Sequence, residues 1–385
     1  MTLILQSNKT ATRSLGNVDG IIGPRDFSLF SDFSMNRHFL NTQAGRVERS
    51  FMDLYSFSRA SPAEYIDELG NPASVGSGVP RLFHNIPGTG TRGLLMEIGG
   101  FNSFKNPTAP VTQTIPLNNV NPYCIAFSVY GPGSLTITGD ITDTYGQFTA
   151  TGMTLIATEG NPAYAFVAAE FNAPGNINVK VNGSPTFVQV ERVRRPWAPS
   201  SRITGDNRAA DQLSISPSVL DSVISPSGDF TIAMHVVNNY TNAYKGAGEV
   251  SGLLEARPIA QAVGAGGDHL ALAARITNIG VKDSALRAYM EGTERSLSVA
   301  AGVPVGRGWT AVLARGGQSA FGAVDGVSAP GVQTVLPLFK PSKLHLGWAE
   351  SWVQNAGLSG VVTKVVVYPR FLSPAEIKAL SSSWM

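Results

Sequence analysis

Five aromatic residues lie in or beside turn-rich segments in the second half of the chain, where their rings could contact a sugar. They are Tyr240, Tyr244, Trp309, Trp348 and Trp352. A ring on a β-sandwich surface can stack on the apolar face of a sugar, while Asn, Asp and Arg side chains orient the hydroxyl groups. The alternative is that Trp309 and Trp348 fill the core, and the usual burial of tryptophan favours it. These five residues are the candidate glycan-binding site.

Catalytic chemistry has little support in the sequence. A polysaccharide hydrolase needs two carboxyl groups facing one another at about 5–10 Å. Glu291 and Glu294 are close in sequence but fall in a predicted turn, and Glu249 and Glu255 are no better placed. We therefore expect a protein that is not an enzyme. Two carboxylates can also meet only in the folded chain, which the sequence does not reveal. A capsule polysaccharide depolymerase therefore stays open as an alternative to a protein without catalytic activity.

Neither a metal nor a cofactor is expected. Cys124 is the one cysteine, so no intrachain disulfide and no cysteine-based zinc site can form. The stretch 88–93 has the form G-x-G-x-x-G, but a strand-like segment follows it where a dinucleotide site requires a helix. The histidines are scattered, and none has a second ligand at metal spacing: His38, His84, His235, His269 and His345.

The composition favours a β-rich protein. The 385 residues include 41 glycines and 24 prolines, and 43% of them are hydrophobic against 15% charged. A net charge of +2 gives no electrostatic reason for a nucleic-acid partner or a membrane surface. The apolar run in the N-terminal MTLILQSNK is too short for a signal peptide, and no stretch is long enough to span a bilayer. We expect no nucleic-acid partner and no membrane insertion.

The elements that must position the candidate residues are strands. From about residue 101, runs rich in Val, Ile, Thr, Tyr and Phe are cut by glycine turns at intervals of roughly 8–15 residues, the spacing of a β-sandwich. Leu135 and Ile137 alternate with threonines, as in a half-buried strand. The second half repeats the pattern without helical periods. The sequence thus predicts an all-β fold of two antiparallel, jelly-roll-like β-sandwiches.

Three parts of the chain follow from this pattern. Residues 1–45, polar at the start and without a clean period, are expected to form an extended arm that needs a partner surface to become ordered. Residues 46–200 form the first sandwich, which ends in the Pro/Ser/Gly-rich stretch near residue 200. Residues 201–385 form the second sandwich.

The tetrapeptide SPAE occurs twice and predicts two different structures. At 373–376, Ser373 is placed as an N-cap, Pro374 as the first helical residue and Glu376 as the capping-box partner of a short C-terminal helix. At 61–64 the same letters are followed by Gly-Asn-Pro within two turns, which favours a β-hairpin with its turn at ELGNP.

Three separated segments carry recognisable motifs, at roughly residues 50–103, 186–215 and 360–383. The first has the pattern F-x-R-A-S-x-A-x-Y-x-D, then V-P-R, then G-L-L-x-E and an Asn. Its residues are Phe57, Arg59, Ala60, Ser61, Ala63, Tyr65, Asp67, Val79, Pro80, Arg81, Gly93, Leu94, Leu95, Glu97 and Asn102. The second segment ends in R-A-A-D, and the third is similar to the terminal strand and helix of a laminin-G-like jelly roll. Together the segments resemble bacteriophage virion proteins of the tail-fibre, receptor-binding or head-decoration type that carry concanavalin A-like (laminin-G-like) lectin domains, which implies that the arm at 1–45 attaches to the virion.

The resemblance implies a phage structural protein on the virion surface, assembled in the host cytoplasm, that presents lectin-like domains to host-surface glycan. It implies other virion proteins as partners, a homo-oligomer with a trimer expected first, and host polysaccharide as a ligand. It carries over no catalytic residue and no cofactor. The alternative from another class is a purely architectural head-decoration or adaptor protein that binds only neighbouring subunits.

Overall fold

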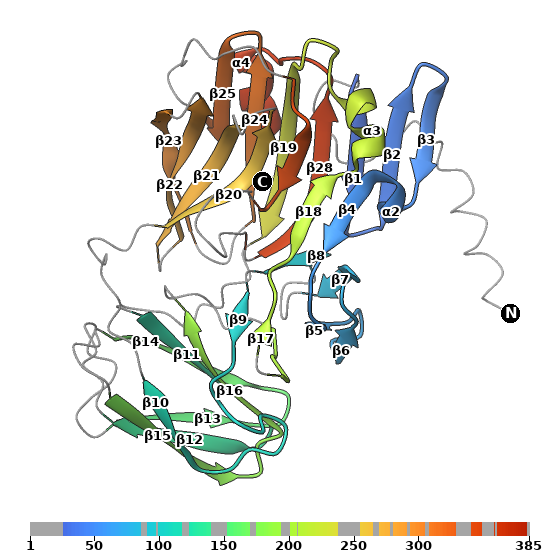
Figure 1. Ribbon diagram of the computed structural model, residues 1–385. Helices are drawn as coiled ribbons and strands as arrows, with labels where there is room; N and C mark the ends of the chain where they lie inside the picture. Colours follow the sequence, from blue (N-terminus) through green and yellow to red (C-terminus); the bar gives the residue numbers. More distant parts are fainter. Residues whose placement is uncertain are drawn as a thin grey trace, which may run out of the picture.

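The chain folds into two antiparallel β-sandwiches, one inserted in the sequence of the other (Figure 1). The computed structural model describes residues 26–85, 91–97, 99–117, 123–139, 152–169, 175–193, 201–205, 207–237, 255–264, 269–277, 280–290, 293–304, 308–328, 340–348, 358 and 360–382. Most of these residues lie in strands and few in helices, which confirms the all-β prediction.

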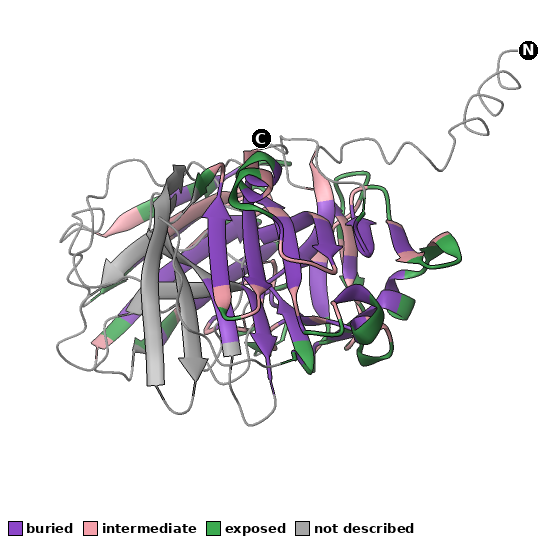
Figure 2. Cartoon of the chain, turned by 90° about the horizontal axis from the view of Figure 1, so that it is seen from above, coloured by how far each residue is buried: buried purple, intermediate pink, exposed green. Residues whose placement is uncertain are grey.

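The larger sandwich contains a ten-stranded antiparallel sheet. Its strands are β1 (Leu29–Asp32), β2 (Arg37–Thr42), β3 (Gly45–Arg49), β7 (Arg81–Asn85), β8 (Arg92–Met96), β19 (Phe230–Val237), β24 (Gly308–Gly316), β25 (Ser319–Val324), β26 (Val327–Ser328) and β28 (Gly360–Tyr368). The order is β26-β25-β24-β19-β28-β1-β2-β3, and β8 pairs with both β28 and β7. Most residues along the central strands of this sheet are buried, as the purple strands in Figure 2 show.

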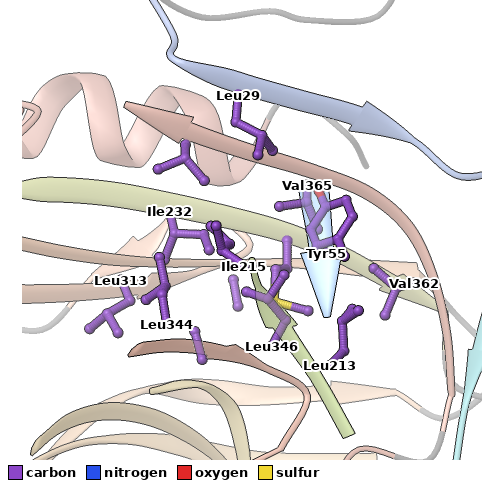
Figure 3. Packing of buried hydrophobic residues seen from close by; sticks show 14 of the residues in the cluster. Leu29, Tyr55, Leu213, Ile215, Ile232, Leu313, Leu344, Leu346, Val362 and Val365 are labelled. Carbon is purple, nitrogen blue, oxygen red and sulfur yellow. The ribbon is translucent and has the colours of Figure 1, made fainter. Parts of the chain in front are cut away.

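A seven-stranded sheet packs on the inner face of the ten-stranded one. Its strands are β4 (Tyr55–Ser58), β18 (Gln212–Ile215), β20 (Glu255–Val263), β21 (His269–Thr277), β22 (Gly280–Met290), β23 (Thr293–Pro304) and β27 (Lys343–Leu346). The order is β23-β22-β21-β20-β27-β18-β4. Ile232 and Val365 of one sheet share a buried layer with Leu213 and Leu344 of the other (Figure 3).

The N-terminal strands belong to this same sandwich, which corrects the expected domain boundaries. Strand β1 pairs with β28, and the Ser28 hydroxyl donates to the carbonyl of Val367, 339 positions away. Strand β4 pairs with β18 through the register Phe57↔Leu213. Residues 29–58 are therefore neither an arm nor part of the first module. Strand β1 is buried on both faces, so its sequence lacks the alternation that reveals a half-exposed strand. Of the arm expected at 1–45, residues 1–25 lie outside the described residues.

The inserted module has its own pair of sheets. Its strands are β10 (Gln113–Leu117), β11 (Tyr123–Tyr130), β12 (Gly133–Gly139), β13 (Met153–Ala157), β14 (Ala163–Ala169), β15 (Gly175–Gly183) and β16 (Phe187–Val193). They form a four-stranded sheet, β10-β15-β12-β13, and a three-stranded sheet, β14-β11-β16. Alternate residues such as Ile137 of β12 and Val190 of β16 fill the core between the sheets.

Short elements complete the fold as the two SPAE segments predict. Strands β5 (Ala63–Ile66) and β6 (Pro72–Val75) form the expected hairpin, and Gly70 in its turn has a φ of 86°, a left-handed conformation that glycine adopts without strain. Helix α2 (Phe51–Leu54) and helix α3 (Pro217–Val223) flank the larger sandwich. Helix α4 (Pro374–Ser382) begins at the Ser373/Glu376 capping box, as predicted, and packs on the outer face of the ten-stranded sheet.

Candidate functional site: a buried charged junction

Five charged side chains meet where the inserted module joins the larger sandwich. Arg59 directly follows β4, Arg81 begins β7, and Glu97 directly follows β8. Arg208 ends the short strand β17 (Asn207–Arg208), and Asp211 directly precedes β18. Each is at most 4% exposed. Because the residues come from the ends of five different strands, the network ties the strand ends to one another.

Asp211 lies at the centre of this network. Its Oδ1 accepts from Nη1 of Arg59 at 3.0 Å, and its Oδ2 pairs with Nη2 of Arg81 and accepts from the backbone N–H of Glu97 at 2.8 Å. Arg81 also pairs with the Glu97 carboxylate, and Nη1 of Arg208 lies 3.5 Å from Oε2 of Glu97. Two carboxylates are thus matched by three guanidinium groups, an arrangement in which each buried charge has an opposite charge beside it.

The remaining donors of Arg59 hold backbone of the β5–β6 region in place. Its Nε donates to the carbonyl of Ser61 at 2.8 Å. Its Nη2 donates to the carbonyls of Gly76 at 2.8 Å and Val79 at 3.0 Å. A guanidinium has five donors in a rigid fork, so Arg59 can pair with Asp211 and still donate to these carbonyls. It thereby fixes the backbone on both sides of the hairpin.

Glu97 is ionised under all ordinary conditions. Burial alone would raise its pKa, but Arg208 and Arg81, with hydrogen bonds from the Ser201 hydroxyl and N–H, lower the pKa to about 2. A general acid needs a pKa near the working pH. This carboxylate is a structural counter-ion and cannot deliver a proton near neutral pH.

A β-bulge places Arg81 in the network. Arg81 pairs with Leu95 and His84 pairs with Gly93, so β7 has one residue more than β8 between these pairs. Phe83, within the bulge, has a φ of 60°, which is rare for an aromatic residue. The extra residue turns both Arg81 and His84 to the face of β8 that leads to Glu97. His84 Nδ1 there accepts from the N–H of Ile66 at 3.1 Å.

Further hydrogen bonds extend the junction into the inserted module. The Asn102 amide donates to the carbonyl of Ile203 at 3.1 Å, and the N–H of Ile203 donates to Oε1 of Gln189 at 2.8 Å. Gln189 donates to the Glu191 carboxylate at 3.2 Å. Gly100 lies so close that an added Cβ would overlap Glu191 and stand 2.8 Å from Cδ1 of Ile203. A larger residue at position 100 would have to displace the ends of these two buried side chains.

An ion pair and an aromatic cluster close the other side of the junction. Nε of Arg202 donates to Oε2 of Glu64 at 2.5 Å, with side chains 24% and 11% exposed. The same guanidinium lies 5.1 Å from the ring centre of Phe187 and 5.8 Å from that of Tyr130. The Tyr164 hydroxyl donates to that of Tyr130 at 3.3 Å. Strand β5 of the β5–β6 hairpin is thereby attached to strands β11, β14 and β16 of the module.

The predicted glycan-binding aromatics are not brought together in the described residues. Trp309, at the start of β24, is completely buried in the core of the larger sandwich, so it cannot stack on a ligand. This corrects its assignment as a contact residue. Trp348 is half-buried, with its ring edge-to-face with His345 at 4.7 Å. Tyr240, Tyr244 and Trp352 lie outside the described residues.

Sequence reasoning missed both the junction and a more exposed ring. Phe101 of β9 (Gly100–Phe101) is 49% exposed and stands opposite the exposed Asn207 of β17. Strand alternation could have indicated that Phe101 points away from the Glu191 side. Arg59, Arg81, Glu97 and Asp211 all belong to the motifs of the phage resemblance. Their positions in the sequence do not reveal that the four side chains contact one another in the fold.

The described part of the chain contains neither a metal-binding cluster nor a membrane-spanning helix. No group of three His, Cys, Asp or Glu side chains in those ranges could hold a metal ion. Among the helices described, none has the length and apolar character needed to cross a bilayer.

Comparison with known proteins gives likenesses of fold in part of the chain. No protein-family model and no curated protein matches the sequence. A Trypanosoma rangeli sialidase in complex with 2,3-difluorosialic acid is 18% identical over 45% of this chain and 26% of that chain, with a TM-score of 0.32.

Two smaller domains are similar to the same degree. The Ruminococcus gnavus IT-sialidase CBM40 bound to α2,3-sialyllactose is 17% identical over 40% of this chain and 82% of that chain, with a TM-score of 0.29. Domain 4 of AbnA, a GH43 extracellular arabinanase from Geobacillus stearothermophilus, in complex with arabinotriose, is 11% identical over 45% of this chain and 73% of that chain, with a TM-score of 0.30. Likeness at this level assigns neither a ligand nor an activity to this chain.

Proposed function

We propose that this chain is a structural protein on the surface of a bacteriophage virion, where it presents two fixed β-sandwich modules to a host-surface glycan. Its partners are then neighbouring virion proteins and further copies of itself, in a trimer, assembled in the host cytoplasm. The proposal rests on the motif resemblance and on the way the motif residues are used in the fold.

One observation carries this proposal. Five charged residues of the separated motifs, Arg59, Arg81, Glu97, Arg208 and Asp211, meet in the buried junction, whereas the motif residue Asp67 accepts hydrogen bonds in the turn of the β5–β6 hairpin. Charges that are sealed from solvent offer no reagent for chemistry; they fix the position of one module on another. This is the requirement of a protein that displays surface from an assembled particle.

The protein acts without catalysis under this proposal. Glu97 and Asp211 are the two carboxylates of the five-residue charged network, and their side chains are 3% and 0% exposed. Both are neutralised by arginines, so neither reaches a saccharide as an acid, a base or a nucleophile. The exposed ring of Phe101, beside the Asn207 amide, provides the kind of mixed apolar and polar surface that a sugar contacts.

The burial of Trp309 favours a second candidate function, that of a purely architectural decoration or adaptor protein. A large ring that fills the core is absent from the surface and contributes to stability instead. In that case the sandwiches contact only neighbouring virion subunits.

Two measurements on the full chain separate these functions. Gold-labelled antibody against the chain should decorate intact particles of the phage that encodes it at regular positions. The labelled protein should also adsorb to host cells, and periodate oxidation of the surface sugars should abolish adsorption. Decoration without adsorption supports the architectural function. Bare particles in a lysate that contains the protein would contradict a virion role.

A further inference from the structure

The outer face of the four-stranded sheet of the inserted module is an exposed polar surface. On β15, alternation turns Ile177 and Val179 into the module core and the residues between them outward. The register places β10 and β12 on either side of β15, and β13 beyond β12. The outward residues, here called the polar face, are Thr114, Pro116, Ser134, Thr136, Thr138, Thr154, Ile156, Asn176, Asn178, Lys180 and Asn182.

The composition of this face works against the strand that carries it. Asn176, Asn178 and Asn182 take three of the four outward positions on β15, one of the two central strands. Asparagine is depleted in strands, whereas Val, Ile and Thr are favoured. The amides make few contacts that offset this: Asn178 Oδ1 accepts from the Thr114 hydroxyl at 2.7 Å, and Asn182 reaches Ser134 at 3.5 Å. Departures of this kind from local preference are expected at functional or strained sites.

The charge on the polar face has one sign. Lys180, exposed on β15, is the one charged residue among the eleven, and its cross-strand neighbour on β12 is Thr136. No carboxylate is present among them to neutralise it. A single cation surrounded by neutral amides and hydroxyls is complementary to a ligand that has many hydroxyl groups and widely spaced negative charges.

The face lacks the features of a protein interface. Interface cores are enriched in aromatic residues, Met and Arg, and depleted in Lys and Ser. The polar face has no aromatic residue; its apolar members are Ile156, which is 72% exposed on the edge strand β13, and Pro116 on the opposite edge strand β10. Its central positions offer hydrogen bonds rather than apolar anchors.

From these observations we propose that the polar face binds an acidic polysaccharide. Lys180 pairs with a carboxylate of the sugar chain, and the Asn and Thr side chains of β15 and β12 exchange hydrogen bonds with its hydroxyl groups. The inference rests on the proposed glycan attachment and names the chemical class of the glycan and the surface that contacts it. It places the contact on the inserted module, away from the aromatic residues first considered.

Affinity electrophoresis of the full chain tests the proposal. The gels contain polygalacturonate, alginate, hyaluronan, polysialic acid or, as the neutral reference, dextran. We expect at least one acidic polymer to retard the protein while dextran does not. Lys180→Gln should raise the dissociation constant about tenfold, and Asn178→Asp, which adds a negative charge to the face, should raise it at least as much.

A matched control and the thermal midpoint keep the result interpretable. Lys378→Gln removes the same charge from an exposed position on α4 and should leave retardation unchanged. All three variants should unfold at the temperature of the parent chain, because the altered side chains are exposed. If an acidic polymer binds but Lys180→Gln and Asn178→Asp bind as the parent does, the polar face is the wrong surface and glycan attachment stands. Retardation by dextran equal to that by the acidic polymers overturns the charge assignment. If none of the polymers binds, the inference fails, whereas glycan attachment fails only if periodate oxidation leaves adsorption to host cells unchanged.

Discussion

Arg59 and Asp211 form a 3.0 Å ion pair in which neither side chain is exposed, although 152 positions separate them in the chain. Asp211 simultaneously neutralises Arg81, so one carboxylate serves two buried guanidinium groups. The pair joins the end of β4 to the start of β18 and fixes the point at which the chain re-enters the larger sandwich. The stability of the junction should therefore depend on this one side chain.

Replacement of Asp211 should be severely destabilising. Asp211→Asn preserves the shape of the side chain but leaves Arg59 and Arg81 without their shared counter-charge. Removing one partner of a buried ion pair costs about 3–5 kcal/mol of unfolding free energy. Urea denaturation followed by circular dichroism measures the loss. Glu68→Gln is the control, because Glu68 pairs with Arg92 at the surface and should cost less than about 1 kcal/mol. Equal losses in the two variants would show that burial of the network is unimportant.

Substitution of Gly100 should loosen the attachment of the inserted module. In Gly100→Ala, the new methyl group overlaps Glu191 and crowds Ile203, and overpacking of this kind costs about 1–3 kcal/mol. Limited proteolysis should cleave near the junction faster than in the parent chain. Gly205→Ala is a close control in the same connecting region, since an added Cβ there meets nothing within 4 Å. A stable, protease-resistant Gly100→Ala protein would disprove the close contact.

Stability should fall in mild acid because of buried histidines. Burial lowers the pKa of His38, His84 and His235 to about 4, from an ordinary value of 6.5. Between pH 6.5 and 4, these histidines are therefore protonated in the unfolded chain but neutral in the folded chain. The stability contribution is fully present above pH 6.5 and is lost as the pH falls towards 4, on the order of 3 kcal/mol for a fully buried histidine.

Removal of one histidine isolates this effect. His38→Gln should flatten the dependence of the urea midpoint on pH between 6.5 and 4, because one fewer proton is bound on unfolding. Below pH 4.5 a further loss is expected down to pH 2, since the pKa of Glu97 is lowered to about 2 and its charge is needed in the network. A pH profile unchanged by His38→Gln would contradict the neutral, buried state of this imidazole.

The two described tryptophans should respond differently to truncation. Trp309→Ala leaves a large cavity in the core and should cost about 3–5 kcal/mol. Trp348→Ala loses an edge-to-face contact with His345 at a half-buried position, worth on the order of 1 kcal/mol. Thermal unfolding by calorimetry measures both. A larger loss for Trp348 than for Trp309 would reverse the assignment of core and surface.

Local chemistry in the sequence was enough for the local elements. The turn around Gly70 predicted the β5–β6 hairpin, because its residues favour left-handed and tight conformations wherever they occur. The Ser373/Glu376 capping box predicted the start of α4 for the same reason: its hydrogen bonds span three residues. Glycine-punctuated runs of strand-forming residues predicted the sandwich class.

The tertiary structure alone decided which segments are partners. Strand β1 became a neighbour of β28, and residues 29–58 joined the C-terminal sandwich, because the pairing depends on hydrophobic surface hundreds of positions away. Trp309 is a core residue because the opposite sheet covers it. The motif charges became a network for the same reason. A buried charge is stable only beside its counter-charge, and no sequence spacing states that Arg59 and Asp211 will meet.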